Sequence, residues 1–372
     1  MARFRKPLIV IATGIAVTGL SLFALDWADK RFPPPIEAAR SVSTEILDRD
    51  GQLLRAFATR EGLWRLKTTA DDVDPALIRM LVAYEDRRFD RHAGVDILAL
   101  GRAAWQFITN GRIVSGASTL SMQVARLIEP RRERSLTAKL IQIARALQLE
   151  RRLSKSEILD LYLTHAPYGG NLEGLRAASL AWFGKEPKRL TTAEAALLVA
   201  LPQLPEKRRP DRFADNALQA RKRVLERAEE AAIIEPSEVA FALSADLPRA
   251  RRQLPALAPH LAEAARRANP TADRHQTTLL RPVQEKLETL AAEAGRKLDP
   301  KVSLALVMAD ATTGEIVAEV GAADYFDASR SGWIDMTRAE RSPGSTLKPF
   351  IYGLAIELGL VAQETIVEDR PA

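Results

Sequence analysis

Hydrophobic and polar positions change their pattern along the chain, and each pattern predicts a different kind of element. Residues 43–58 hold two apolar-rich runs that meet at an Asp-Gly pair, which predicts a β-hairpin. From 74 to about 203 the apolar residues recur at helical spacing, so this part is predicted to be helical. Near residue 277 the pattern of apolar and polar positions changes. Residues 302–320 form two β-type runs around a Thr-Gly pair, which predicts strands in this part of the chain.

Capping residues place three helix starts. Asp74 stands directly before a proline, which suits an N-cap followed by proline at the first helical position. Ser154 with Glu157, and Thr191 with Glu194, match the capping box, in which each side chain binds the backbone N–H group of the other residue. The region from 74 to about 203 is therefore predicted to contain several separate helices.

The first apolar run extends from Pro7 to Leu25 and carries no charge. As a helix it would be roughly 28 Å long at about 1.5 Å per residue, close to the hydrocarbon thickness of a bilayer. Arg3, Arg5 and Lys6 precede it, and the charges after it nearly cancel, so the positive-inside bias predicts a cytoplasmic N-terminus. A cleaved signal peptide is the alternative, although its apolar core is shorter and no clear small-x-small cleavage site is present.

Composition narrows the possible classes. The chain has 372 residues, 47% of them hydrophobic, which fits two globular domains in addition to the anchor. It contains no cysteine, so disulfides and thiolate metal sites are excluded. The 54 basic residues exceed the 48 acidic ones, and the net charge of +6 favours an anionic partner such as lipid phosphate or nucleic acid. Nucleic acid is disfavoured, because the sequence shows no aromatic-basic interleaving and no zinc pattern.

A glutamate lies near the C-terminal end of the helix that is predicted to begin at residue 75. A helix that begins at 75 and buries Leu77, Leu81 and Tyr84 places Glu85 near its C-terminal end. The negative pole of the helix dipole raises the pKa of a carboxyl group there, whereas the arginines that follow it lower that pKa. Taken by itself, this segment is more often a solvated helix end than a catalytic base.

A polar segment rich in Ser and Thr follows at residues 116–126. Small residues that lead into a helix can present backbone N–H groups to a phosphate. If Ser118 caps this helix, then Thr119, Gln123 and Arg126 lie on one polar face beside any bound anion. An ordinary capped amphipathic helix is the alternative explanation of the pattern.

Near the C-terminus, Ser345 and Lys348 have the SxxK spacing within the longer segment RSPGSTLKPFIYGLA. On a helix this spacing puts the lysine one turn from the serine, where it can activate the hydroxyl as a nucleophile. The four-residue pattern is weak by itself, and the longer segment is far more specific.

Taken in chain order, LVAYEDRRFDRH, GASTLSMQVAR, SKSEILDLYL and SPGSTLKPF resemble the class A penicillin-binding proteins, and most of all their 1C type. In those bifunctional proteins a family 51 peptidoglycan glycosyltransferase domain precedes a transpeptidase domain. The resemblance implies an α+β multidomain fold, with an N-terminal transmembrane helix, a mostly α lysozyme-like glycosyltransferase domain and an incomplete α/β penicillin-binding transpeptidase domain.

The domain boundaries are predicted from this resemblance and from the changes of texture. They are a cytoplasmic tail and transmembrane anchor at 1–30, a periplasmic linker and β-hairpin at 31–60, the glycosyltransferase domain at 61–230, a connector at 231–275 and the N-terminal part of the transpeptidase domain at 276–372. The sequence stops before any SxN or KTG element, so we do not expect transpeptidase activity from this truncated chain.

The resemblance also implies roles for single residues. Glu85 matches the general base that takes the proton from the 4-hydroxyl of the acceptor sugar. Ser345 and Lys348 match the transpeptidase nucleophile and its activating partner. The implied substrate-binding residues are Asp86, Phe89, His92, Ser118, Thr119, Gln123, Arg126, Arg134, Lys139 and Gln142.

The chain departs from the family's pattern at three of the motif positions. Met122 replaces one of two glutamines, Arg126 stands where a lysine is usual, and Gln142 replaces a second glutamate. Because a glutamine takes no proton, an acid, base or metal-holding role of that glutamate is lost. Arg126, Arg134 and Lys139 remain to neutralise a pyrophosphate leaving group. No cofactor is therefore required, and a divalent metal, Mg or Mn, is optional.

Together these observations predict a single-pass enzyme of the bacterial inner membrane with periplasmic catalytic domains. It would polymerise lipid II into β-1,4-linked glycan strands and release undecaprenyl pyrophosphate. Its expected partners are lipid II, the growing glycan chain, the membrane and other cell-wall synthesis proteins, with no nucleic acid. A lytic murein hydrolase, which shares the helical fold type and an acidic residue, and a non-catalytic cell-wall scaffold, which Gln142 makes plausible, are the alternatives.

Overall fold

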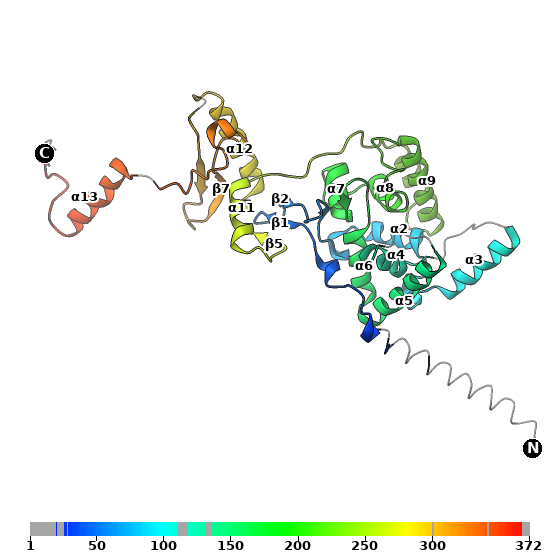
Figure 1. Ribbon diagram of the computed structural model, residues 1–372. Helices are drawn as coiled ribbons and strands as arrows, with labels where there is room; N and C mark the ends of the chain where they lie inside the picture. The colour runs from blue at the N-terminus through cyan, green and yellow to red at the C-terminus, as the bar shows by residue number, and fades with distance from the viewer. Residues whose placement is uncertain are drawn as a thin grey trace, which may run out of the picture. The chain divides into compact units, whose positions relative to one another are not determined.

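The structure, a computed structural model, describes residues 20, 26–27, 29–110, 118–130, 135–299, 301–340 and 342–366 (Figure 1). Two compact units make up the chain, Met1–Thr278 and Leu279–Ala372. The predicted anchor from Pro7 to Leu25 lies outside the described residues, apart from Leu20. Among the helices that are described, none is both long enough and apolar enough to cross a membrane.

The first unit contains the predicted hairpin. Strands β1 (Thr44–Leu47) and β2 (Leu53–Phe57) pair antiparallel, and β5 (Arg274–Gln276) adds to β1 in parallel. The turn forms because the Asp48 Oδ1 atom accepts the backbone N–H groups of residues 50 and 52 at 2.9 and 2.8 Å. Gly51, at φ +79, supplies the left-handed backbone that this turn requires. The prediction of a hairpin at 43–58 is confirmed.

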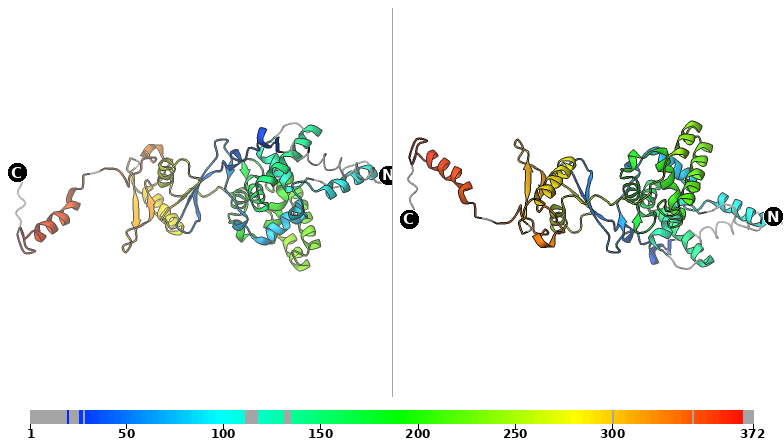
Figure 2. Two further views of the ribbon diagram at one scale, coloured as in Figure 1. Left: turned by 90° about the horizontal axis from the view of Figure 1, so that it is seen from below. Right: turned by 90° about the horizontal axis from the view of Figure 1, so that it is seen from above.

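Helices dominate the rest of the first unit (Figures 1 and 2). They are α2 (Pro75–Glu85), α3 (Ile97–Asn110), α4 (Leu120–Ile128), α5 (Leu136–Arg152), α6 (Lys155–His165), α7 (Leu175–Phe183), α8 (Thr192–Ala200), α9 (Ala214–Glu230), α10 (Pro236–Ser244) and α11 (Pro259–Ala268). Short 3-10 turns lie between them at η1 (Ala38–Arg40), η2 (Ala70–Asp72), η3 (Phe89–Arg91), η4 (Pro187–Arg189) and η5 (Leu201–Gln203). Strands β3 (Trp64–Arg65) and β4 (Leu172–Glu173) pair in parallel.

Capping chemistry sets the starts of three of these helices as the sequence predicts. The Asp74 Oδ1 atom accepts the Ala76 N–H group at 2.7 Å, and Pro75 is the first residue of α2. Capping boxes are present at Ser154 with Glu157 and at the start of α8. All three predicted helix starts are confirmed.

The core of the first unit forms where α2, α8 and α9 pack together. Leu77, Leu81 and Tyr84 of α2 are buried, as predicted. α9 contributes Val224 and Leu225 to the same core. The helix α2, which carries Glu85, is therefore held against α8 and α9 by one continuous apolar cluster.

The second unit is smaller. Strands β6 (Leu306–Ala309) and β7 (Ile316–Val320) form the predicted antiparallel hairpin, and α12 (Arg281–Gly295) packs against β7. The Gln284 side chain makes two 2.8 Å hydrogen bonds with the backbone of Glu319, which fixes α12 to the strand. Two 3-10 turns, η6 (Ala328–Arg330) and η7 (Gly344–Leu347), lead to α13 (Lys348–Glu357), which has no buried residue among those described.

Candidate active site

Glu85 is the last residue of α2 and is half-buried. Two side-chain amides hold its carboxylate. The Gln123 Nε2 atom, on α4, donates to Oε2 at 2.8 Å, and the Gln203 Nε2 atom, on η5, donates to Oε1 at 2.8 Å. Both carboxylate oxygens therefore have a fixed donor. Gln123 is predicted from the sequence as a substrate-binding residue, but neither its contact with Glu85 nor that of Gln203 is predicted.

Burial is the largest influence on the Glu85 carboxyl group, and it raises its pKa. The two amide hydrogen bonds and the charges of Arg208 and Arg227 act in the opposite direction but do not cancel the effect of burial. The arginines that follow Glu85 directly in the sequence are not the ones that oppose the shift, and one of them, Arg88, pairs with Asp96. A carboxylate with a raised pKa is a better proton acceptor than an ordinary one.

Asp86 and His92 are turned inward and hold the start of α4. The Asp86 Oδ2 atom accepts the N–H group of Leu120, the first residue of α4, at 2.9 Å. The His92 Nδ1 atom accepts the Gly94 N–H group at 3.2 Å, so Nε2 carries the proton and donates to Asp86 at 3.0 Å. These contacts give both side chains an internal role, and substrate contact by them stays a prediction.

The residue that caps α4 is Thr119, so the expectation that Ser118 is the cap is wrong. The Thr119 Oγ1 atom accepts the Met122 N–H group at 3.2 Å and donates to the Gly94 carbonyl at 2.6 Å. Thr119 is consequently buried and does not share an exposed polar face with Gln123 and Arg126. Gly94 has φ +93, and a Cβ atom there would lie 2.8 Å from the Ala146 carbonyl oxygen, so only glycine fits this contact.

Lys139 is the centre of a second polar group beside α4. Its Nζ atom donates to the Ser118 Oγ atom at 2.8 Å and to the Gln142 Oε1 atom at 3.0 Å. The other end of the Gln142 amide donates to the Met122 carbonyl at 2.6 Å, a contact that a carboxylate could not make. Burial lowers the pKa of Lys139, and the nearby Arg126 lowers it further. Both cations therefore lie close enough to attract one anion.

The other predicted site residues are dispersed. Phe89 is buried, with the Lys155 Nζ atom 4.5 Å from its ring centroid, and serves the core. Arg134 lies outside the described residues. Ser345 and Lys348 are in the second unit, and both are exposed. Within the described part of the chain, no hydrogen bond joins their side chains; only the Lys348 N–H group reaches the Ser345 carbonyl.

Two buried tyrosines complete the surroundings of Glu85. Burial raises the pKa of Tyr162 and Tyr168, and the charge of Glu85 adds to both shifts. The Tyr162 hydroxyl has no hydrogen-bond partner among the described residues. Neither tyrosine was predicted as a site residue, because both lie far from Glu85 in sequence and the local pattern at α6 indicates only a capped helix.

The residues present offer little to a divalent metal. In the ranges that the structure describes, no group of three His, Asp or Glu side chains lies together as metal ligands would. At the position of the family's second glutamate, Gln142 presents a neutral oxygen that already accepts a hydrogen bond from the Lys139 ammonium group. The optional role of Mg or Mn stays a prediction.

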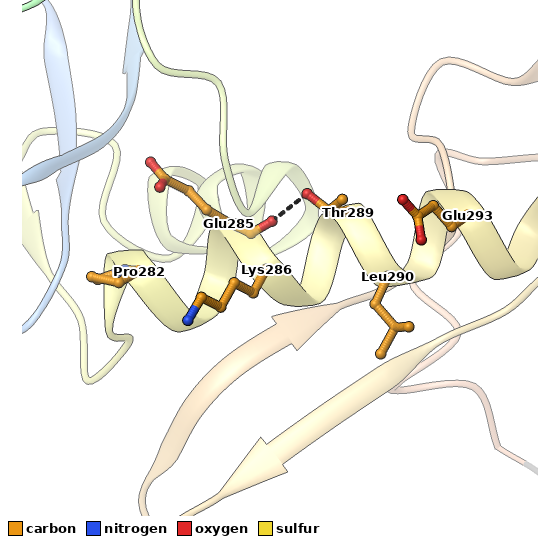
Figure 3. Close-up of a pocket in the computed structure, with 6 residues that line it drawn as sticks. All are labelled: Pro282, Glu285, Lys286, Thr289, Leu290 and Glu293. Carbon is orange, nitrogen blue, oxygen red and sulfur yellow. Dashed lines mark hydrogen bonds between the residues drawn. The ribbon is translucent and has the colours of Figure 1, made fainter.

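Two surface hollows lie elsewhere. One, of about 400 Å³, is lined only by residues of α12, including Lys286, Leu290 and Glu293 (Figure 3). Figure 3 also shows the Thr289 hydroxyl bonded to the Glu285 carbonyl of the same helix, at 2.8 Å. The other, of about 340 Å³, lies in the first unit beside β2 and β3. No predicted site residue lines either hollow.

Comparison with known proteins gives consistent results. A family model for transglycosylases matches residues 50–229, and one for the penicillin binding protein transpeptidase domain matches residues 304–372. The chain is 42% identical over 358 residues to penicillin-binding protein 1C of Escherichia coli (strain K12), with 96% of this chain and 46% of that protein covered. It is 34% identical over 239 residues to penicillin-binding protein 1A of Pseudomonas aeruginosa, with 63% of this chain and 29% of that protein covered.

The chain thus spans less than half the length of these two relatives. A crystal structure of penicillin-binding protein 1A from Haemophilus influenzae is 17% identical and covers 85% of this chain and 52% of that one. Its TM-score is 0.32, a likeness too weak to bear on the fold.

Proposed function

Because the chain belongs to the class A penicillin-binding protein family, we propose that its first unit is a peptidoglycan glycosyltransferase. The substrate is lipid II, the product is a β-1,4-linked glycan strand, and undecaprenyl pyrophosphate leaves. The observation that carries the proposal is the half-buried carboxylate of Glu85, which two amides hold and whose pKa burial raises. These are the properties of a general base.

In the proposed reaction Glu85 accepts the proton of the acceptor sugar's 4-hydroxyl group. The oxygen attacks the anomeric carbon of the donor chain as the bond to pyrophosphate breaks, with inversion. Because both Glu85 oxygens are held by neutral amides, the carboxylate meets the hydroxyl in one orientation. Deprotonation and attack then occur together at a preorganised site.

The leaving group needs positive charge. Arg126 on α4 and Lys139 on α5 lie near each other and supply this charge, and Arg134 is a third candidate from the sequence. The lowered pKa of Lys139 reflects burial and a neighbouring cation, and a pyrophosphate between the two would relieve that repulsion. No metal is required by this scheme; Mg or Mn, when bound, would add further neutralisation of the pyrophosphate.

Membrane attachment is part of the proposal. The uncharged stretch from Pro7 to Leu25 anchors the chain, with the N-terminus in the cytoplasm and both units in the periplasm. Three large apolar side chains of α3 are exposed, namely Ile97, Leu98 and Trp105. Their exposure supports contact of this helix with the bilayer surface. In Figures 1 and 2, α3 projects away from the other helices of its unit.

Incubation of the purified protein with labelled lipid II tests the proposal. Formation of glycan polymer supports a glycosyltransferase. Cleavage of isolated sacculi without reaction of lipid II would indicate a lytic murein hydrolase, and inertness toward both would indicate a non-catalytic scaffold.

Replacement of the base is the sharper test. Glu85→Gln keeps the size of the side chain and removes its ability to take a proton, so polymerisation should fall by at least about 10²-fold, as is typical for loss of general-base catalysis. Lipid II binding, followed by fluorescence of a labelled substrate, should remain. Near-normal turnover in this variant would remove Glu85 from the role of base.

A further inference from the structure

The second amide on Glu85 comes from an element that the polar motifs do not include. Gln203 ends η5, directly after α8, and the four helices α5 to α8 separate it in sequence from Gln123 on α4. Its Nε2 atom donates to the Glu85 Oε1 atom at 2.8 Å, while Gln123 serves Oε2 at 2.8 Å. Two elements therefore determine the plane of one carboxylate.

The direction of the Gln203 amide is itself determined. Its Oε1 atom accepts the Tyr84 hydroxyl at 3.3 Å and an Nη1 hydrogen of Arg208 at 3.2 Å. The same Nη1 atom donates to the Ala200 carbonyl at 2.5 Å, which ties the buried arginine to the end of α8. If the amide were reversed, its NH₂ group would face a guanidinium and its oxygen would face a carboxylate, so only one orientation is stable.

Gln203 is exposed, whereas Arg208 is buried. Water can therefore compete for the Gln203 amide, and its hydrogen bond to Glu85 is weaker than a buried one. Exposure also means that Gln203 can be replaced without a cavity in the core. The residue thus offers a test of site geometry that is separate from folding.

We propose that Gln203 is a positioning residue, which holds the Oε1 atom of Glu85 in a fixed direction and favours the ionised carboxylate. The inference rests on the proposed function, in which Glu85 is the base. A hydrogen bond donated to a carboxylate stabilises its charged form, and the Gln203 bond opposes the burial that raises the pKa of Glu85. Loss of this bond should raise that pKa further.

The test variant is Gln203→Leu, which keeps a side chain of roughly similar bulk and removes both donor and acceptor. Gln219→Leu is the matched control, because Gln219 is an exposed glutamine on α9, outside the site. For each protein, lipid II polymerisation is measured from acid to neutral pH. In parallel, the side-chain carboxyl groups of glutamates labelled with ¹³C are titrated by NMR, and the Glu85 signal is identified by its absence in Glu85→Gln.

We expect Gln203→Leu to lower kcat by about tenfold at neutral pH, near the lower end for a hydrogen bond to a charged group, with KM unchanged. The acid limb of its pH profile and the Glu85 titration should both move to higher pH, while Gln219→Leu behaves as the unaltered protein does. A purely structural role for Gln203 would lower activity equally at all pH values.

The two measurements separate the inference from the function on which it rests. If the unaltered protein fails to polymerise lipid II, the proposed function is wrong, but the NMR titration still decides whether Gln203 sets the protonation of Glu85. If polymerisation is normal and the Glu85 titration is the same with glutamine and leucine at 203, the inference is overturned and the function stands.

Discussion

At the scale of single residues, burial decides which side chains titrate away from their ordinary pKa. Glu85 and Lys139 are both shifted toward their neutral forms, and burial is the largest cause in each case. Their partners are mostly neutral: amides for Glu85, and a hydroxyl and an amide for Lys139. Neutral partners leave the charges available to a substrate, which a salt bridge between the two residues would not.

His165 gives a prediction of stability against pH. It is buried at the end of α6, where its Nε2 atom donates to the Ala39 carbonyl at 2.6 Å. Burial, helped by the charge of Arg65, lowers its pKa from 6.5 to about 4. Between these values the unfolded chain takes up a proton that the folded chain does not. The contribution of neutral His165 to the free energy of unfolding should therefore be complete above pH 6.5. The free energy of unfolding should fall by about 3 kcal/mol as the pH drops toward 4.

Denaturant unfolding at several pH values between 4 and 7 measures this effect. His165→Gln keeps an amide donor for the Ala39 carbonyl and removes the titration, so its stability should depend less steeply on pH than that of the unaltered protein. The difference in slope is the measure, because the substitution can also change stability by a constant amount. Equal slopes for the two proteins would assign the pH dependence to other groups.

At the scale of elements, the sequence predicts turns and helix caps that depend on neighbouring residues, and it does not predict contacts between distant segments. The hairpin turn at Gly51, the N-cap at Asp74 and the two capping boxes depend on residues within a few positions of one another. Thr119 was missed as the cap of α4 because Ser118 is chemically equivalent, and the choice depends on the carbonyl of Gly94 in another segment. The role of Gln203 also depends on a distant contact, because its side chain meets Glu85 only after α8 has packed against α2. The local sequence around Gln203 therefore does not predict it.

One buried ion pair joins the strand layer of the first unit to its helices. Glu45 on β1 is fully buried and binds Arg176, which is buried on α7 and also bonds Glu186 at 2.7 Å. Removal of one partner leaves a buried charge only partly compensated, which costs about 3 to 5 kcal/mol. We expect Glu45→Gln to lower the free energy of unfolding by about 3 kcal/mol, toward the lower value, because Glu186 remains.

Glu263→Gln is the matched control for this prediction, since Glu263 pairs with Arg266 at 2.9 Å on the surface of α11. An exposed pair of this kind contributes about 0 to 1 kcal/mol. Urea unfolding of both variants at neutral pH makes the comparison. If the two substitutions had equal effects, the Glu45 pair would not be a link between the layers.

At the scale of the whole molecule, the two units differ in how completely their predicted reactive groups are enclosed. Glu85 lies among side chains from α2, α4 and η5, on a continuous core. Ser345 and Lys348 lie on an exposed turn and at the start of a helix that has no buried residue among those described. The small core of the second unit consists of Leu287, Ala291, Ala318 and Val320, and includes neither η7 nor α13.

This difference predicts separate outcomes for the two activities in one preparation. Acylation by a penicillin needs an oxyanion site and a groove around the nucleophile, and loss of even one oxyanion donor costs about 10² to 10³ in rate. Because Ser345 is exposed and none of the hydrogen bonds among the described residues involves its side chain, we expect the 372-residue chain not to label with fluorescent penicillin. The same preparation should polymerise lipid II, which serves as the control for folding. Stoichiometric labelling that disappears in Ser345→Ala would show that the acylation site is already assembled around Ser345 and Lys348.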